Sequence, residues 1–256
     1  MSVDYVDYHV HALGHKGGQY SEELLIPYIH RARGQGIREL GFADHDEYIA
    51  GIDEASIASL KTRFTDLNVK LGLEVSYRPG REEEIKAAAR RFPFDFLIGS
   101  VHDLDSWMFD HPDYRFGYSS WDIAELYRKY YSVLEKLALC GLFDIVGHLD
   151  VIKVFGYQPE GDLLPFAEPA LQAISRAGLV VEANTAGLHK PCAEIYPSKE
   201  LLARCFELNI PVTLGSDAHI ESEVGRDFAY ARELLYQIGY RRLTTFVQRR
   251  RGSILL

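Results

Sequence analysis

Short apolar segments alternate with longer amphipathic segments along the whole chain. The first apolar segment, Val3 to Tyr8, alternates apolar and polar residues as a half-buried β-strand does, and further short apolar runs follow it. Between these runs, apolar residues recur at helical spacing, and Ser21 and Ser198 stand where helix N-caps are expected. The predicted strands cover residues 3–8, 39–43, 69–73, 94–101, 143–147, 179–183 and 211–214, and the predicted helices cover residues 21–35, 53–67, 82–91, 121–140, 166–177, 198–208 and 228–238.

This β-α alternation predicts parallel strands joined by crossover helices. The 256 residues and the hydrophobic fraction of 47% suffice for one large core. No linker rich in proline, glycine or serine divides the chain. We therefore expect an α/β protein with a single domain over residues 1–256.

Histidines and carboxylates follow most of the predicted strands. His9 and His11 are two residues apart at the end of the first strand, so both imidazoles should point to the same face. Because the C-terminal ends of parallel barrel strands meet at one mouth, we expect the side chains at the strand ends to gather there. The candidates are His9, His11, His45, Glu74, His102, His148, Asp217 and His219, with His15 in the loop after the first pair.

These candidates outnumber the ligands of a single metal ion. A catalytic zinc ion takes about three protein ligands and keeps one position open, so the set indicates two or three ions. Imidazole and carboxylate ligands suit Zn, Fe or Mn, and the Glu74 carboxylate could bridge two ions. Clustered ions make hydroxide available near neutral pH and hold phosphoryl oxygens. Hydrolysis of a phosphate ester is therefore the expected chemistry.

Basic side chains after the later strands could contact a phosphate group. Lys153 follows the fifth strand, Lys190 the sixth and Arg226 the seventh. Each could bind a phosphate oxygen, and each could equally be a solvated surface cation.

The net charge and the cysteines indicate which binding partners and which cellular location to expect. The net charge of −9 disfavours long nucleic acids and anionic membranes. Together with the phosphate chemistry expected of the metal site, this leaves a small phosphorylated substrate. The chain has three scattered cysteines, no membrane-spanning apolar run and no signal-peptide pattern, so we expect a cytoplasmic protein with reduced thiols. The sequence does not indicate an oligomeric state.

An ordered set of motifs spans most of the chain. The motifs are His9-Val10-His11, Ala43-Asp44-His45, Gly72-Leu73-Glu74-Val75, Ser100-Val101-His102, Gly147-His148, Glu182 to Leu188 and Gly215 to His219. In this order they resemble the PHP (polymerase and histidinol phosphatase) family, and most closely its histidinol-phosphate phosphatase branch. The resemblance implies a distorted (β/α)7 TIM-like barrel, a centre of three divalent metal ions, and hydrolysis of L-histidinol phosphate to L-histidinol and phosphate in histidine biosynthesis.

The resemblance also implies a ligand set for each ion. The first ion would take His9, His11, Glu74 and Asp217; the second Glu74, His102 and His148; the third His45, His219 and His15. His15 comes slightly earlier in its loop than the matching histidine of relatives, so either it reaches the ion by another path or the third site is altered.

The same resemblance assigns roles in substrate binding and catalysis. Lys153 matches one phosphate-binding position, and His189, followed by Lys190, stands where an arginine is expected. The residues implied in catalysis are Glu74, which bridges two ions, and Asp217 or His219, which could relay a proton to the leaving group.

An insert between the fourth and fifth strands, Asp103 to Ser120, either covers the pocket or packs over the barrel rim. Its acidic residues could bind the cationic groups of histidinol; they are Asp103, Asp105 and Asp110. Its aromatic residues could form a lid over the pocket; they are Trp107, Phe109, Tyr114 and Phe116.

Three other functions stay open from the sequence alone. One is a phosphoesterase of the same family acting on nucleotides or other small phosphate esters. Another is an amidohydrolase-type metal-dependent barrel, which also opens with a His-x-His motif. The last is a metal site that only stabilises the domain.

Overall fold

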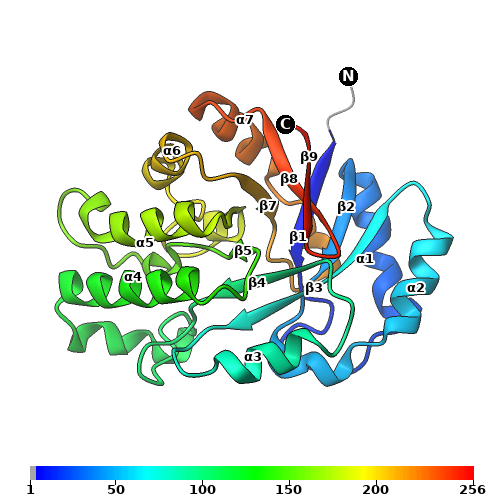
Figure 1. Ribbon diagram of the computed structural model, residues 1–256, viewed down its shortest axis with the longest axis horizontal. Helices are drawn as coiled ribbons and strands as arrows, with labels where there is room; N and C mark the ends of the chain where they lie inside the picture. The colour runs from blue at the N-terminus through cyan, green and yellow to red at the C-terminus, as the bar shows by residue number, and fades with distance from the viewer. Residues whose placement is uncertain (1–3) are drawn as a thin grey trace.

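The computed structural model describes residues 4–256, and seven parallel strands form its centre (Figure 1). Each strand pairs with the next one along the chain. The strands are β1 (Tyr5–Val10), β2 (Ile37–Phe42), β3 (Asn68–Ser76), β4 (Phe96–Ser100), β5 (Ile145–Val146), β6 (Val180–Asn184) and β7 (Val212–Gly215). Every predicted strand is present, although Val3 of the first one lies outside the described residues.

Across the same residues, seven α-helices alternate with the strands and lie outside them (Figure 1). Ser21 and Ser198 cap α1 and α6 as predicted, because their side chains accept from the backbone N–H groups of Leu24 and Leu201. The helices are α1 (Glu22–Gly34), α2 (Glu54–Arg63), α3 (Glu82–Ala89), α4 (Ile123–Leu139), α5 (Leu164–Ala177), α6 (Lys199–Glu207) and α7 (Phe228–Ile238). None of the helices between residues 4 and 256 has both the length and the apolar character needed to cross a membrane.

Two hydrogen bonds close the barrel between its first and last strands. His11 N donates to Ala218 O at 2.8 Å, and Ala218 N donates to His9 O at 3.2 Å. The barrel is irregular, because the β1–β2 register shifts between Asp7 and Val10 and β5 has only two residues. The expectation of a distorted (β/α)7 TIM-like barrel is confirmed.

The sequence analysis missed an antiparallel hairpin formed by β8 (Arg242–Val247) and β9 (Arg250–Leu255), red in Figure 1. The hairpin hydrogen-bonds to residues that precede the barrel strands. Gln248 N donates to the Asp95 carboxylate just before β4, and Arg249 Nε donates to the Asp144 carboxylate just before β5. Arg251 donates to Gly178 O before β6. The hairpin therefore covers the N-terminal ends of the strands, opposite the strand ends that carry the candidate ligands.

Aromatic rings from the barrel and the hairpin form one packed layer at this closed end. Phe246 of β8 is fully buried, and its ring centroid lies 5.8 Å from that of Tyr8 and 6.1 Å from that of Phe96. A Cβ atom at Gly72 would overlap the ring of Phe96, so a glycine is needed there for this ring to enter the barrel. Strand β8 of the hairpin is thus part of the core.

Truncating the hairpin's anchor should destabilise the whole barrel. We expect Phe246→Ala to lower the free energy of unfolding by about 3–5 kcal/mol, because it removes a buried aromatic ring and leaves a cavity. Urea denaturation followed by circular dichroism measures this change. The control is Val247→Ala, whose parent side chain is 54% exposed and which should shift stability by less than about 0.5 kcal/mol. Equal stability of the two variants would contradict the role of Phe246 in the core.

Candidate metal centre

The side chains predicted from the strand ends meet around Glu74. This residue projects from β3 and is fully buried. Imidazole nitrogens lie close to its two carboxylate oxygens, at 2.7 Å (His45), 3.1 Å (His148), 3.2 Å (His102), 3.3 Å (His9) and 3.5 Å (His11). Glu74 lies inside β3, which continues to Ser76, and not at the end of a strand as the sequence analysis expected.

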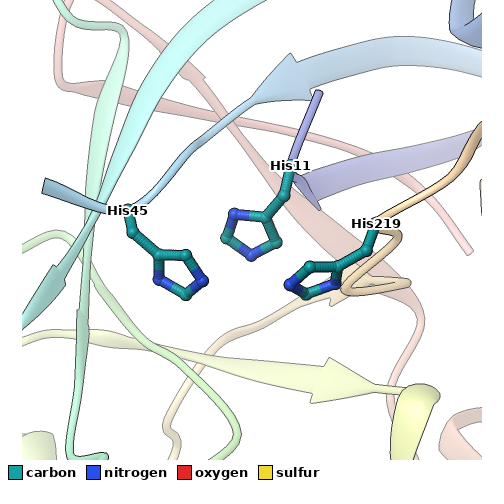
Figure 2. A group of neighbouring side chains, drawn as sticks. All are labelled: His11, His45 and His219. Atoms are coloured by element: carbon teal, nitrogen blue, oxygen red, sulfur yellow. The ribbon is translucent and has the colours of Figure 1, made fainter. Parts of the chain in front are cut away.

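Two further predicted donors, Asp217 and His219, come from the segment after β7. Asp217 Oδ1 lies 3.3 Å from His11 Nε2 and 3.9 Å from His9 Nε2. His219 packs against His11, with 4.5 Å between the ring centroids. Figure 2 shows His11, His45 and His219 directed toward one another from three different segments.

Several overlapping groups of donor atoms are compact enough to hold ions. In each group the donor atoms lie within 4.8 Å of one another; the groups are His11, His45 and His219; His9, His11 and Glu74; His9, His148 and Asp217; and His45, Glu74 and His102. Each group shares at least one member with another group. This sharing is what a polynuclear site needs, since a single ligand shell would not require it.

Many of these donor atoms are buried without a hydrogen-bond partner among residues 4–256. They include His9 Nε2, both ring nitrogens of His11, His45 Nε2, Glu74 Oε2, His148 Nδ1 and His219 Nε2. An unsatisfied buried polar atom costs about 1–3 kcal/mol, so such a cluster needs another partner. Imidazole nitrogens and carboxylate oxygens are ligands of Zn, Fe and Mn, so these residues fit metal ions.

Opposite effects act on the charge of Glu74. Burial alone would raise the pKa of this carboxyl group, but the imidazoles of His9, His102 and His45 together hold it well below its usual value. The pKa of His11 is lowered well below its usual value, first by burial and then by the neighbouring His45. Glu74 is thus kept as an anion and His11 as a neutral donor, the forms that bind a cation.

His15 lies at the outer side of the cluster. Its ring centroid is 4.6 Å from that of His219 and 5.3 Å from that of His45, and the residue is exposed. The compact donor groups place His11, and not His15, with His45 and His219. The structure therefore brings His15 beside the predicted third site, and its role as a ligand stays a prediction.

Two buried aspartates, whose roles the sequence analysis did not identify, hold the segments that carry the donors. Asp7 of β1 accepts from Ser216 N at 3.0 Å, from Ser216 Oγ at 2.6 Å and from Gly225 N at 3.0 Å. It thereby ties β1 to the segment with Asp217. Burial raises the pKa of Asp7 to about 6, although the bonds from Ser216 and Gly225 lower it.

Asp44 does the same for the loop that follows His11. It accepts from Leu13 N at 2.9 Å, from Ala12 N at 3.2 Å and from Tyr20 Oη at 2.7 Å. An acidic residue within or directly after an apolar strand, as in Val6-Asp7-Tyr8, is the sequence signal that could have identified these two positions.

Lys153 is not the available cation that the sequence analysis expected. Its side chain is buried, and its Nζ lies 2.7 Å from carboxylate oxygens of Asp150 and Glu194 and donates to Ile195 O at 2.9 Å. Burial would lower the pKa of Lys153, but the two carboxylates raise it above its usual value. The alternative of a solvated surface cation is therefore wrong. Phosphate binding by Lys153 stays a prediction, and the two carboxylates that neutralise its ammonium group weigh against it.

The other predicted phosphate-binding residues lie nearer the surface. His189 Nε2 is 2.6 Å from the Asp227 carboxylate, which links the segments after β6 and β7. Arg226 is partly buried and lies 3.2 Å from the Glu223 carboxylate, while Lys190 is exposed. Phosphate binding by His189, Lys190 and Arg226 stays a prediction.

The three acidic residues considered in the insert differ in the residues that surround them. Asp103 pairs with Arg78 at 3.1 Å and Asp105 pairs with Lys129, so neither is the free acid expected for substrate cations. Asp110 forms no ion pair with a lysine or arginine among residues 4–256, and it lies close enough to two histidines of the cluster to feel their charge. Burial raises its pKa, while the nearby imidazoles of His102 and His148 lower it.

The insert's aromatic residues divide between core and surface. Phe109 is fully buried against Tyr130, and Trp107 packs against Tyr118. Phe116 and Tyr114 are 71% and 52% exposed. The buried part packs over the rim, as one interpretation expected, and only the exposed pair is free to cover a pocket.

Comparisons with known proteins agree with the geometry. Residues 7–186 match the family described as "PHP domain". A protein of Deinococcus radiodurans named "Probable histidinol-phosphatase" is 37% identical, over 93% of this chain and 95% of its own length. A "Histidinol-phosphatase" of Lactococcus lactis is 29% identical, over 94% of each chain. A crystal structure of a histidinol phosphate phosphatase from Lactococcus lactis, complexed with zinc, L-histidinol and phosphate, has the same fold, with a TM-score of 0.78. The two sequences are 24% identical, and the match covers 97% of this chain and 98% of the other.

Removing the buried ammonium of Lys153 should damage stability more than substrate binding. We expect Lys153→Met to lower the free energy of unfolding by about 3–5 kcal/mol, because Asp150 would be left buried without its cation. Urea denaturation measures the loss, and Lys190→Met, which changes an exposed lysine, should stay within about 0.5 kcal/mol of the parent. A Lys153→Met protein of parental stability that only needs more substrate would instead restore the phosphate-binding role.

Proposed function

The chain belongs to the PHP domain family, and we propose that it is a metal-dependent phosphatase that hydrolyses L-histidinol phosphate to L-histidinol and phosphate, a reaction of histidine biosynthesis. The observation that carries this proposal is the set of overlapping donor groups around Glu74. Such a site suits hydrolysis of a phosphate monoester. The substrate is inferred from relatives named histidinol-phosphatases, one of which is 37% identical over 93% of the chain.

We propose three divalent ions in this centre. His9, His11, Glu74 and Asp217 would hold the first. Glu74 with His102 and His148 would hold the second, in line with the 3.2 Å between the Nε2 atoms of the two histidines. His45 and His219, with His15 beside them, would hold the third. Zinc is the first metal to test, since the Lactococcus lactis protein was crystallised with it, and Fe and Mn suit the same ligands.

When bound, the ions would lower the pKa of a water molecule and offset the charge that develops on the phosphoryl oxygens. The protein's own part is to hold the donors in place and to supply protons. Glu74 would contribute negative charge to the ions held around it. Asp217 and His219 have side chains 18% and 30% exposed, so both can be reached by a substrate. His219 Nε2 and the Asp217 carboxylate are the two candidates for relaying a proton to the leaving alkoxide.

Asp110 would contribute to substrate selection. It is the insert acid whose pKa is lowered by the nearby imidazoles of His102 and His148, although burial raises it, while Asp103 and Asp105 pair with other cations. A carboxylate at the mouth could bind the ammonium or imidazole group of histidinol. We also infer that residues 1–256 act as one unit, because the hairpin beyond the matched segment packs into the barrel core. A cytoplasmic location is inferred from the free cysteines Cys140, Cys192 and Cys205.

Another small phosphate ester, such as a nucleotide, is the second candidate substrate. The observation that favours it is His189, which stands where an arginine was expected and pairs with Asp227. The family match favours either phosphatase over an amidohydrolase-type enzyme.

A substrate panel separates the two candidates. With zinc-loaded protein, we expect kcat/KM for L-histidinol phosphate to exceed that for p-nitrophenyl phosphate and for nucleoside monophosphates by at least about tenfold, because binding of the substrate's cationic groups discriminates between substrates. Phosphate release measures the rates. Equal values across the panel would remove histidinol phosphate as the specific substrate.

Neutralising the shared carboxylate should remove both metal and activity. Loss of a residue that only hydrogen-bonds to a metal ligand typically lowers activity about 10- to 100-fold. We expect Glu74→Gln to lower kcat/KM by more than that, because the ions would lose the carboxylate they are proposed to share. Metal analysis and phosphate release test this expectation. The matched control is Glu39→Gln, a buried glutamate of β2 at the opposite end of the barrel, which should keep its metal. Parental metal content in Glu74→Gln would refute the shared-ligand role.

A further inference from the structure

Glu182 of β6 is a buried carboxylate directly behind the donor cluster, and it is outside the proposed ligand sets. We propose that it is a positioning residue: it fixes the ring of His9 so that Nε2 faces the other donors. This inference rests on the proposed metal-dependent function. The side chain of Glu182 is 1% exposed, so bulk water does not compete for its hydrogen bonds.

The contacts of Glu182 determine which nitrogen of His9 can bind an ion. Glu182 Oε1 lies 2.7 Å from His9 Nδ1. A carboxylate oxygen accepts hydrogen bonds, so a contact of this length is made by an N–H at His9 Nδ1 that donates to Glu182. His9 Nε2 then points to the opposite side, 3.3 Å from Glu74 Oε1 and 3.9 Å from Asp217 Oδ1. Nε2 is therefore the atom presented to an ion.

The second oxygen of Glu182 reaches a different part of the cluster. Oε2 accepts from the backbone N of His148 at 2.9 Å and from Asn184 Nδ2 at 3.1 Å. One carboxylate thus holds the side chain of His9 on β1 and the backbone of His148 after β5. Because these histidines belong to two different proposed ion sites, Glu182 would act on both.

A glycine leaves the space that this arrangement needs. Gly215, at the end of β7, lies between Glu182 on β6 and His9 on β1. A Cβ atom at position 215 would overlap Glu182 Oε1 and would lie 2.7 Å from the Cβ of His9. The backbone conformation of Gly215 does not require glycine, since its φ is not in the left-handed region. The absent side chain therefore serves the contact between Glu182 and His9.

The role predicts a specific effect on metal binding. Replacing a hydrogen-bonding partner of a metal-bound histidine typically weakens binding about 10- to 100-fold. In Glu182→Gln the amide has nearly the same size, but it has one accepting oxygen where the carboxylate has two. It cannot accept from both His9 and His148 through separate oxygens. A carboxylate that only filled space would be replaced by this amide without loss of metal affinity.

The experiment compares zinc affinity in three proteins by competition with a chromophoric chelator. Glu182→Gln should bind at least one zinc ion about 10- to 100-fold more weakly than the parent. Glu39→Gln is the matched control, since Glu39 is a buried glutamate that accepts from Tyr8 at the closed end of the barrel. It should keep parental affinity. Equal affinities in the parent and in Glu182→Gln would overturn the proposal.

A measurement on the parent alone keeps the inference testable if Glu182→Gln does not fold. In metal-free protein labelled with ¹⁵N-histidine, His9 Nδ1 should carry a hydrogen-bonded proton that exchanges slowly with water. A bare Nδ1, or a proton that exchanges at the rate of a free imidazole, would overturn the positioning role. If the parent binds no metal, the proposed function fails, and this proton still decides whether Glu182 holds His9.

Discussion

The Glu74 carboxylate lies fully buried within 3.5 Å of imidazole nitrogens from five histidines, which come from four different strand ends. The two oxygens of one carboxylate are too few to pair fully with all five histidines, and His11 keeps both ring nitrogens without a hydrogen-bond partner among residues 4–256. The arrangement is costly for a protein alone and favourable around cations. The packing energy of the barrel must therefore offset the cost of holding these donors together.

Three further carboxylates keep the donors there. Asp7, Asp44 and Glu182 are buried, and each accepts hydrogen bonds from backbone groups of a segment other than its own. Their bonds cross between strands or between a strand and a loop, so the donor-bearing segments are fixed relative to one another. Glu74 requires the donors to be close together, and these carboxylates supply the rigidity that prevents the segments from separating.

The sequence predicted the strands, the helices and the donor cluster better than it predicted the hairpin and the partners of charged side chains. The alternation of apolar and amphipathic segments located every barrel strand, and α7 has the predicted bounds, because local pattern and barrel topology agree there. The hairpin was missed, because β9 is arginine-rich and almost entirely exposed and so lacks a buried face. The burial of Lys153 was missed, because one of the carboxylates that neutralise it, Glu194, is 41 residues away. The other carboxylate, Asp150, is only three residues away and does not by itself indicate burial.

The contact between Tyr8 and the backbone of Phe246 joins positions 238 residues apart. During synthesis the first strand emerges from the ribosome long before the strand that covers its end of the barrel. Until then the aromatic layer stays open to water and to other nascent chains. Closure of this end of the barrel is therefore a late, long-range step, and long-range contacts are associated with slow folding.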